Sequence, residues 1–397
     1  MSVNPSANAW VIKLLNILEN QNIDAEKLYP LLRENGFIYG TNLNEIYTST
    51  PHKLNYTQEE LAKLNLLSAL FYVYQIEFPN RDLSDFQDKL ISFYGQIQIE
   101  KKHKFFEWPS FKSKPDVQIE KLMHQRIKAK TNLLEKNFSN IVTNTLLNID
   151  VECFRVFCQG NHKIIEFASQ LETALINVIS IGLHKKSNKS NYEELLIKLL
   201  ESSLRYQDTQ IENFENINLI NFDQFKNKST KLYILDAAAM SIFSDEIVDD
   251  NERQFIHELG QLLKLSSDEI HESIKSISSF VRENYDKIPY FNNANPIKNF
   301  YDKTYRSTSL LIIRNKNRLI KEISQSKELL ILLKKSTHTD LSHDEKKIVK
   351  RQLMDIFKSI PSLAIFAIPG GSVLLPIIIK LIPTLLPSAF NENLEEN

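Results

Sequence analysis

Glycine is rare in this chain, with eight residues among 397. An average protein contains about 7% glycine, and both tight β-hairpins and phosphate-binding loops depend on it. A chain so poor in glycine lacks much of the turn chemistry that a sheet or a nucleotide-binding fold requires. The sequence therefore predicts an all-α protein built from several helical bundles. Its length is enough for two or three domains with separate cores.

The composition is that of a folded globular protein, with 42% hydrophobic and 24% charged residues. Forty-eight Lys and Arg residues nearly balance 49 Asp and Glu residues, so the net charge gives no indication of a DNA partner. The only cysteines are Cys153 and Cys158, too few for a disulfide framework. The N-terminus, MSVNPSANAW, lacks the basic region of a secretory signal. These features predict an intracellular protein with reduced thiols.

Helix-start signals recur along the chain. A Ser or Thr followed three residues later by Glu is a capping box, which marks the first turn of a helix. Ser84 is expected to cap a helix that carries Phe86, Leu90 and Phe93, and Ile164–Leu183 forms a long apolar helical pattern. The predicted capping boxes are Thr57 with Glu60, Ser266 with Glu269, and Ser342 with Glu345.

The predicted helices divide the chain into six segments. A Lys-rich stretch with two prolines, Lys101–Pro115, is interpreted as a linker that closes the first segment. The predicted segments are an N-terminal helical domain (1–110), a long-helix bundle (111–228), a smaller helical domain (229–285), connecting helices (286–339), a C-terminal apolar segment with the helix before it (340–390) and an acidic tail (391–397).

An acidic loop separates two predicted helices in the region Leu232–Arg282. The order helix, acidic loop, helix, short turn, helix resembles the tellurite-resistance TerB-like helical domain, although Glu246 stands where that family has a glycine. The resemblance implies a divalent-cation site at Asp245 and Glu252, which match the family's acidic pair, and Asp249 in the same loop is a further candidate ligand. The alternative interpretation is that these carboxylates cap helices and favour the N-terminal dipole.

Catalytic signatures are absent from the sequence. The stretches beginning at His257 and His271 lack the second histidine of H-E-x-x-H, and no G-x-S-x-G, Walker or G-x-G-x-x-G motif occurs. The sequence therefore predicts a protein that is not an enzyme and has no cofactor, apart from the cation considered above.

The most apolar stretch of the chain is Ile360–Phe390, which nevertheless holds five of the thirteen prolines. It includes a run of 20 uncharged residues, Ile360–Ile379, a length that matches the roughly 30 Å hydrocarbon core of a membrane. The preceding predicted helix carries a basic flank, and the tail after the stretch carries only acidic charges. By the positive-inside rule this asymmetry places the bulk of the chain on the cytoplasmic side. The basic flank consists of Lys346, Lys347, Lys350, Arg351 and Lys358.

Read without gaps, Asp355–Phe390 resembles the membrane segment of the leucine zipper/EF-hand-containing transmembrane (Letm) family. That pattern is an Asp, an apolar run between prolines, Leu-Leu-Pro, a Lys, and a closing Leu-Pro-Ser-x-Phe. The matching positions are Asp355, Pro361, Pro369, Leu374, Leu375, Pro376, Lys380, Leu381, Pro383, Leu386, Pro387, Ser388 and Phe390. The combination of TerB-like and Letm-like regions also resembles bacterial proteins described as Letm-related and biofilm-associated.

The resemblance implies inner-membrane residence, ribosome binding and cation/proton exchange. Two departures bear on these implications. Ser372 stands where the family has an acidic side chain, which argues against transport because an intramembrane carboxylate is usually kept for ion handling. The family's ribosome-binding domain is also expected after the Leu-Pro-Ser-x-Phe motif, whereas only seven residues follow Phe390 here.

Three hypotheses follow. The first is an adaptor at the cytoplasmic face of the inner membrane, with the membrane and the ribosome as partners. The second is a soluble interaction scaffold, with protein partners or self-association, in which the prolines bend the C-terminal segment into the core. The third is a cation transporter or divalent-cation sensor that uses the carboxylates of the acidic loop, Asp245, Asp249, Asp250 and Glu252.

Overall fold

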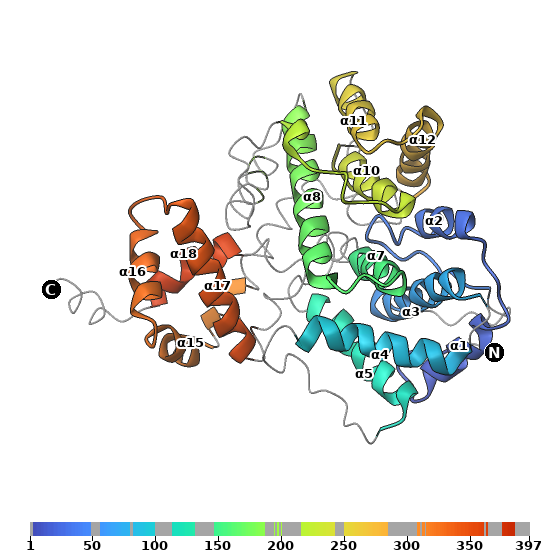
Figure 1. Ribbon diagram of the computed structural model, residues 1–397, viewed down its shortest axis with the longest axis horizontal. Coiled ribbons are helices and arrows are strands. Elements are labelled where there is room, and N and C mark those ends of the chain that lie inside the picture. Colours follow the sequence, from blue (N-terminus) through green and yellow to red (C-terminus); the bar gives the residue numbers. More distant parts are fainter. Residues whose placement is uncertain are drawn as a thin grey trace, which may run out of the picture.

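The computed structural model describes residues 3–48, 56–79, 82–99, 113–131, 147–186, 216–242, 250–284, 315–360 and 375–385, together with isolated positions between 194 and 200 and between 308 and 363. Within these residues every regular element is a helix and no strand occurs, which confirms the all-α prediction (Figure 1). The α-helices are α1 (Trp10–Leu18), α2 (Ala25–Glu34), α3 (Gln58–Glu77), α4 (Leu83–Ile99), α5 (Pro115–Thr131), α7 (Leu147–Cys158), α8 (Ile164–Lys185), α10 (Lys228–Ile242), α11 (Asp250–Leu262), α12 (Ser267–Asn284), α15 (Lys316–Ile323), α16 (Lys327–Lys335), α17 (His343–Ser359) and α18 (Leu375–Leu385), with the 3-10 helix η1 (Ile217–Leu219).

Helix α3 is the central helix of the N-terminal half. All of its residues from Leu61 to Tyr74 are buried, because α1, α2, α5 and α7 surround it. A helix that is covered on every side needs apolar residues around its whole circumference. Aromatic rings of α3, α4 and α7 meet at its end, where Phe86 packs edge-on against Phe71 and Phe154.

Helices α8 and α10 form a second core with α7, α11 and α12. Gly182 of α8 permits the approach of α10, since a Cβ at this position would lie 2.8 Å from the Ser241 hydroxyl oxygen. Gly260 plays the same part between α11 and α12, where a Cβ would lie 2.4 Å from the side chain of Ile270. Close packing of these helices thus depends on two of the few glycines in the chain.

The helix starts agree largely with the sequence predictions. The capping boxes at Thr57 and Ser342 are complete, and Ser266 exchanges the same pair of hydrogen bonds with Glu269. The prediction for Ser84 is wrong. Asp82 caps α4 instead, with its carboxylate accepting from the backbone N–H of Asp85 and from the Ser84 hydroxyl. Asp is as good an N-cap as Ser, and a carboxylate gains further from the helix dipole.

A buried ion pair joins the N-terminal helices to the second core. Arg33 of α2 donates two hydrogen bonds to the Asp236 carboxylate of α10, at 2.7 and 2.9 Å. The hydroxyls of Tyr29 and Ser273 also donate to Asp236, whose side chain is fully buried. Burial by itself would lower the pKa of Arg33, but the adjacent Asp236 carboxylate outweighs it and the pKa is raised. The carboxylate is thus fully hydrogen-bonded, as a buried charge requires.

A second buried ion pair also joins an Arg and an Asp on different helices and includes a Tyr hydroxyl. Arg126 of α5 binds both carboxylate oxygens of Asp150 on α7, and the Tyr94 hydroxyl of α4 donates to the same carboxylate. Burial and the nearby Asp150 raise the pKa of Tyr94 well above its usual value, so the phenol stays protonated and donates. Helix α5 also packs against α1, α3 and α4, so contacts run across the predicted boundary at residue 110. The predicted segment boundaries themselves stay predictions.

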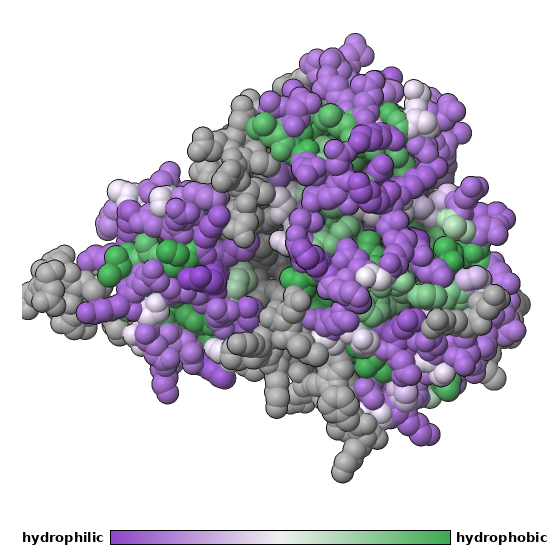
Figure 2. Space-filling model, in the orientation of Figure 1, coloured by the Kyte–Doolittle hydropathy of each residue, from purple (hydrophilic) through white to green (hydrophobic). Residues whose placement is uncertain are grey.

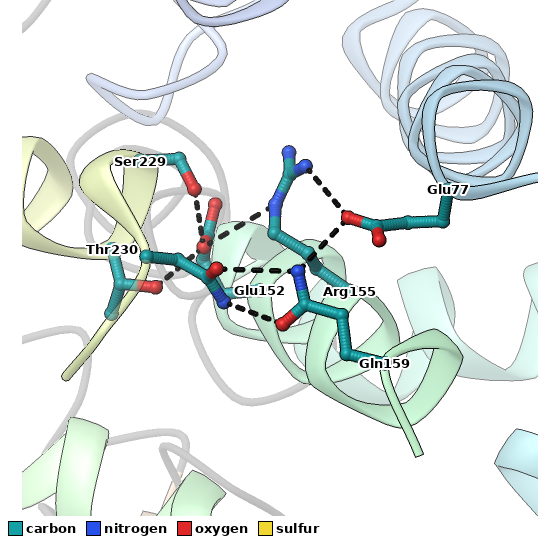
Figure 3. Close-up of polar contacts among 7 residues, drawn as sticks. Glu77, Glu152, Arg155, Gln159, Ser229 and Thr230 are labelled. Atoms are coloured by element: carbon teal, nitrogen blue, oxygen red, sulfur yellow. Dashed lines mark hydrogen bonds and ion pairs between the residues drawn. The ribbon is translucent and has the colours of Figure 1, made fainter. Parts of the chain in front are cut away.

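Figure 3 shows a third polar cluster, where α3, α7 and the first turn of α10 meet. The Glu152 carboxylate accepts hydrogen bonds from the hydroxyls of Ser229, at 2.8 Å, and Thr230, at 2.6 Å. Arg155, one turn along α7, forms an ion pair with Glu77 at 3.7 Å. A carboxylate at the start of α10 is favoured by the helix dipole, so the cluster is explained by helix packing.

Candidate functional site

The four helices α15 to α18 form a C-terminal helical unit, seen at the left of Figure 1. Helix α16 packs against α17 and α18, and α15 packs against α17. The apolar stripe of α17 is Val349, Leu353 and Phe357, spaced four residues apart and each fully buried. Such spacing places the three side chains on one face of the helix.

Polar contacts fix the register of these helices. Ser326, the N-cap of α16, donates a hydrogen bond to Gln352 of α17 at 2.6 Å, and Gln352 donates to Glu328. At the other end of the hairpin the ammonium of Lys335 lies 2.6 Å from the Glu345 carboxylate. This hydrogen bond, together with the capping hydrogen bond from Ser342, holds the pKa of Glu345 below its usual value.

The predicted basic flank lies on α17. Arg351 is exposed, whereas Lys346, Lys347, Lys350 and Lys358 are half-buried and keep part of their side chains in solvent. Long Lys side chains commonly pack their stems along a helix while the ammonium group stays hydrated. Figure 2 shows the visible face of this unit as mainly hydrophilic, crossed by narrower hydrophobic bands.

The Letm-pattern residues fall in two places. Asp355 is exposed on α17 and pairs with Lys358 at 2.7 Å. Leu375, Pro376, Lys380, Leu381 and Pro383 lie in α18. The remaining candidates lie outside the described residues; they are Pro361, Pro369, Ser372, Leu374, Leu386, Pro387, Ser388 and Phe390.

Two prolines of the apolar segment lie within helix α18. Pro376 is its second residue, where the missing N–H sacrifices no helical hydrogen bond, and Pro383 lies near its end. Six residues of α18, from Leu375 to Ile379 and Ile382, are buried, and α16 is its main packing partner. Lys380 is exposed. The described part of the apolar segment therefore packs within the C-terminal helical unit.

One described helix, α8, is long and apolar enough to cross a membrane by length and composition. Within its apolar window 67% of the residues are buried inside the protein, as expected for a core helix. Helix α18 is also apolar, but its 11 residues span about 16 Å at 1.5 Å per residue, against roughly 30 Å of hydrocarbon. Membrane association thus has weak support from the described helices.

The predicted cation site is only partly described. Glu252 lies in the first turn of α11 and is buried, while Asp245 and Asp249 lie outside the described residues. Within the described parts of the chain no three His, Cys, Asp or Glu side chains come together as a metal site would require. The cation site stays a prediction.

Comparison with known proteins finds one similarity, in the C-terminal region. A family model described as LETM1-like, RBD, the ribosome-binding domain of LETM1-like proteins, matches residues 341–397. No curated protein and no solved structure matches the chain significantly. The fold and this match together define an all-α protein whose residues 341–397, which include α17 and α18, are similar to the LETM1-like ribosome-binding domain. The Letm resemblance is confirmed for this region, and the TerB-like resemblance stays a prediction.

The match also corrects one expectation. The ribosome-binding domain of the family was expected after the Leu-Pro-Ser-x-Phe motif that ends at Phe390, but the match to the family model begins at Leu341 and includes the motif. Helices α17 and α18 both fall within the matched region.

Proposed function

We propose that this protein is a ribosome-binding adaptor of Letm-related type that contacts the ribosome through its C-terminal helical unit. The observation that carries the proposal is the match of residues 341–397 to a family model for a ribosome-binding domain.

The local charge of helices α15 to α17 supports this proposal. Residues 315–360 contain eleven Lys and Arg residues and six Asp and Glu residues, a net charge of +5, although the whole chain has a net charge of −1. Ribosomes present a polyanionic surface of RNA, and Lys and Arg contribute affinity by neutralising phosphates. The balanced total charge of the chain hides this local excess.

Co-sedimentation of the full-length protein with purified ribosomes tests the proposal. Phe357→Ala removes a fully buried ring from the core of the C-terminal helical unit, whereas Phe255→Ala removes one from α11 in the second core. Each change costs about 3–5 kcal/mol locally. We expect Phe357→Ala to abolish co-sedimentation and Phe255→Ala to preserve it. Wild-type protein that stays in the supernatant at low salt refutes the proposal.

A second candidate role is membrane association at the cytoplasmic face of the inner membrane. The observation that favours it is the uncharged run Ile360–Ile379, which continues into α18. Burial of α18 against α16 favours the alternative of a soluble scaffold. Cell fractionation separates the two, since a membrane protein requires detergent for release. Links to cation homeostasis and to biofilm physiology rest on the family resemblance alone.

A further inference from the structure

A small cavity opens beside the second core, between α8, α11 and η1, and we call it the α8–α11 cavity. Its volume is about 310 Å³. Cavities that bind small molecules in proteins have volumes from roughly 300 Å³ upwards, so this one has room for a small ligand and not for a macromolecular partner. The cavity lies outside residues 341–397, so its occupant is a separate matter from ribosome binding.

The buried part of the cavity wall is apolar. It consists of Ile181 of α8, Ile217 of η1 and Phe255 of α11, and all three residues are buried. Gly182, next to Ile181, lets α11 approach α8 at this point, since a Cβ here would lie 3.3 Å from the Phe255 ring. Core packing therefore holds this part of the wall in place, as a preformed binding site requires.

The exposed part of the wall carries two opposite charges. Lys185 lies one turn after Ile181 on α8, and Glu258 lies one turn after Phe255 on α11. Among the described residues, no ion pair joins these two side chains to each other or to a third residue. Glu258 accepts one hydrogen bond through its Oε1 atom, from the Gln254 amide at 2.8 Å. Its Oε2 atom and the Lys185 ammonium group are thus available to a ligand.

Two side-chain amides of η1 add a donor and an acceptor. The Asn216 amide oxygen accepts hydrogen bonds from the backbone N–H and the side-chain amide of Asn218, at 3.0 and 3.1 Å. These two hydrogen bonds orient both side chains at the wall of the cavity. They leave the amide nitrogen of Asn216 and the amide oxygen of Asn218 without a partner in the described part of the chain.

The two charges restrict the chemistry of the ligand. An anion would bind Lys185 but leave the Glu258 carboxylate as a like charge against it, and a cation would meet the reverse problem. Nucleic acids and anionic membranes recruit clustered cations, which this wall does not offer. A molecule with both an ammonium and a carboxylate group satisfies both side chains through charge-assisted hydrogen bonds.

We propose that the α8–α11 cavity binds a small zwitterion of the amino-acid type. Lys185 and Asn216 donate hydrogen bonds to the carboxylate of the ligand. Glu258 and Asn218 accept hydrogen bonds from its ammonium group, and its carbon chain lies against the apolar part of the wall. The N-terminal body of the protein thereby gains a small-molecule site that its C-terminal helical unit does not share.

Isothermal titration calorimetry of the full-length protein tests the proposal. The probes glycine, leucine, γ-aminobutyrate and ε-aminocaproate carry the same two charges on carbon chains of different length, whereas hexanoate and hexylamine carry one charge each. The site variants are Lys185→Gln and Glu258→Gln. The matched controls, Lys275→Gln and Glu272→Gln, remove the same charges from exposed positions on α12. Glutamine keeps good helix propensity, and circular dichroism checks that all four variants fold.

We expect at least one zwitterion to bind wild-type and control proteins with equal affinity. Each site variant should bind it about tenfold more weakly, because one charge-assisted hydrogen bond is lost. Wild-type protein should prefer the zwitterion over hexanoate and hexylamine by a similar factor. Lys185→Gln should lose the preference over hexylamine, and Glu258→Gln should lose the preference over hexanoate, because each variant lacks the group that recognises the missing charge.

Three results would overturn the proposal. The first is that no zwitterion of the series binds wild-type protein at millimolar concentration. The second is that hexanoate or hexylamine binds as tightly as the best zwitterion, which would mean that one charge is enough. The third is that the α12 controls lose as much affinity as the site variants. None of these results would change the outcome expected for ribosome co-sedimentation, so the two proposals fail separately.

Discussion

The buried ion pair between Arg33 and Asp236 provides the sharpest stability prediction. The Arg33 side chain is 7% exposed and that of Asp236 is fully buried, so Arg33→Met leaves a carboxylate in the core without its counter-charge. The hydroxyls of Tyr29 and Ser273 still donate to it, but they carry no charge. Removing one partner of a buried pair costs about 3–5 kcal/mol. At about 2 °C per kcal/mol for a large domain, the melting temperature should fall by roughly 6–10 °C.

Differential scanning calorimetry measures this effect against an exposed pair. Lys264 and Asp223 also form an ion pair, but both side chains are 70% exposed, so Lys264→Met should lower the melting temperature by less than about 2 °C. Adding Asp236→Asn to Arg33→Met removes the unpaired charge and should recover part of the loss. A shift for Arg33→Met no larger than that of the control refutes this account, as does a further full loss on adding Asp236→Asn.

Three further predictions concern local packing and titration. Gly260→Ala should lower the free energy of unfolding by about 1–3 kcal/mol, measured by urea denaturation, because the added Cβ would overlap the Ile270 side chain. A glycine-to-alanine change at a helix position with free space would instead leave the stability unchanged or raise it. Burial, with a smaller contribution from Glu77, raises the pKa of the Cys158 thiol to about 12, so a disulfide reagent at pH 8 should label it far more slowly in native than in urea-unfolded protein. The pKa of Glu345 is lower in the folded protein than its usual value. Its contribution to stability is therefore complete above the usual glutamate pKa and is lost as the pH falls through the lower folded-state value. Glu345→Gln should make the unfolding free energy less dependent on pH in this acidic range.

Local signals were well predicted from the sequence. Helix starts depend on side chains within three residues of the first turn, and the capping boxes at Thr57 and Ser342 form as expected. The long helix α8 follows directly from its apolar pattern. Where two neighbouring residues were both capable of capping, as with Asp82 and Ser84, the spacing alone did not distinguish them.

Long-range partnerships were beyond sequence reasoning. Arg33 and Asp236 are separated by 203 positions, and nothing near either residue indicates the other. The same holds for Arg126 and Asp150, since a single sequence does not show which helices pack together. For the candidate site, the basic flank was recognised from its composition, but it was interpreted as a membrane flank. The burial of its apolar face and the partial burial of its lysines depend on how α17 packs against α15 and α16.

Lysine footprinting of the full-length protein, with and without ribosomes, tests the central claim most directly. An amine-reactive reagent is applied to both samples, and modification at each lysine is quantified by mass spectrometry. We predict that ribosomes protect Lys347 and Lys358 of α17, while Lys13 of α1 and Lys275 of α12 react as in the free protein. Protection confined to the N-terminal helices, or equal reactivity at every lysine in the presence of ribosomes, would contradict a ribosome-binding C-terminal helical unit.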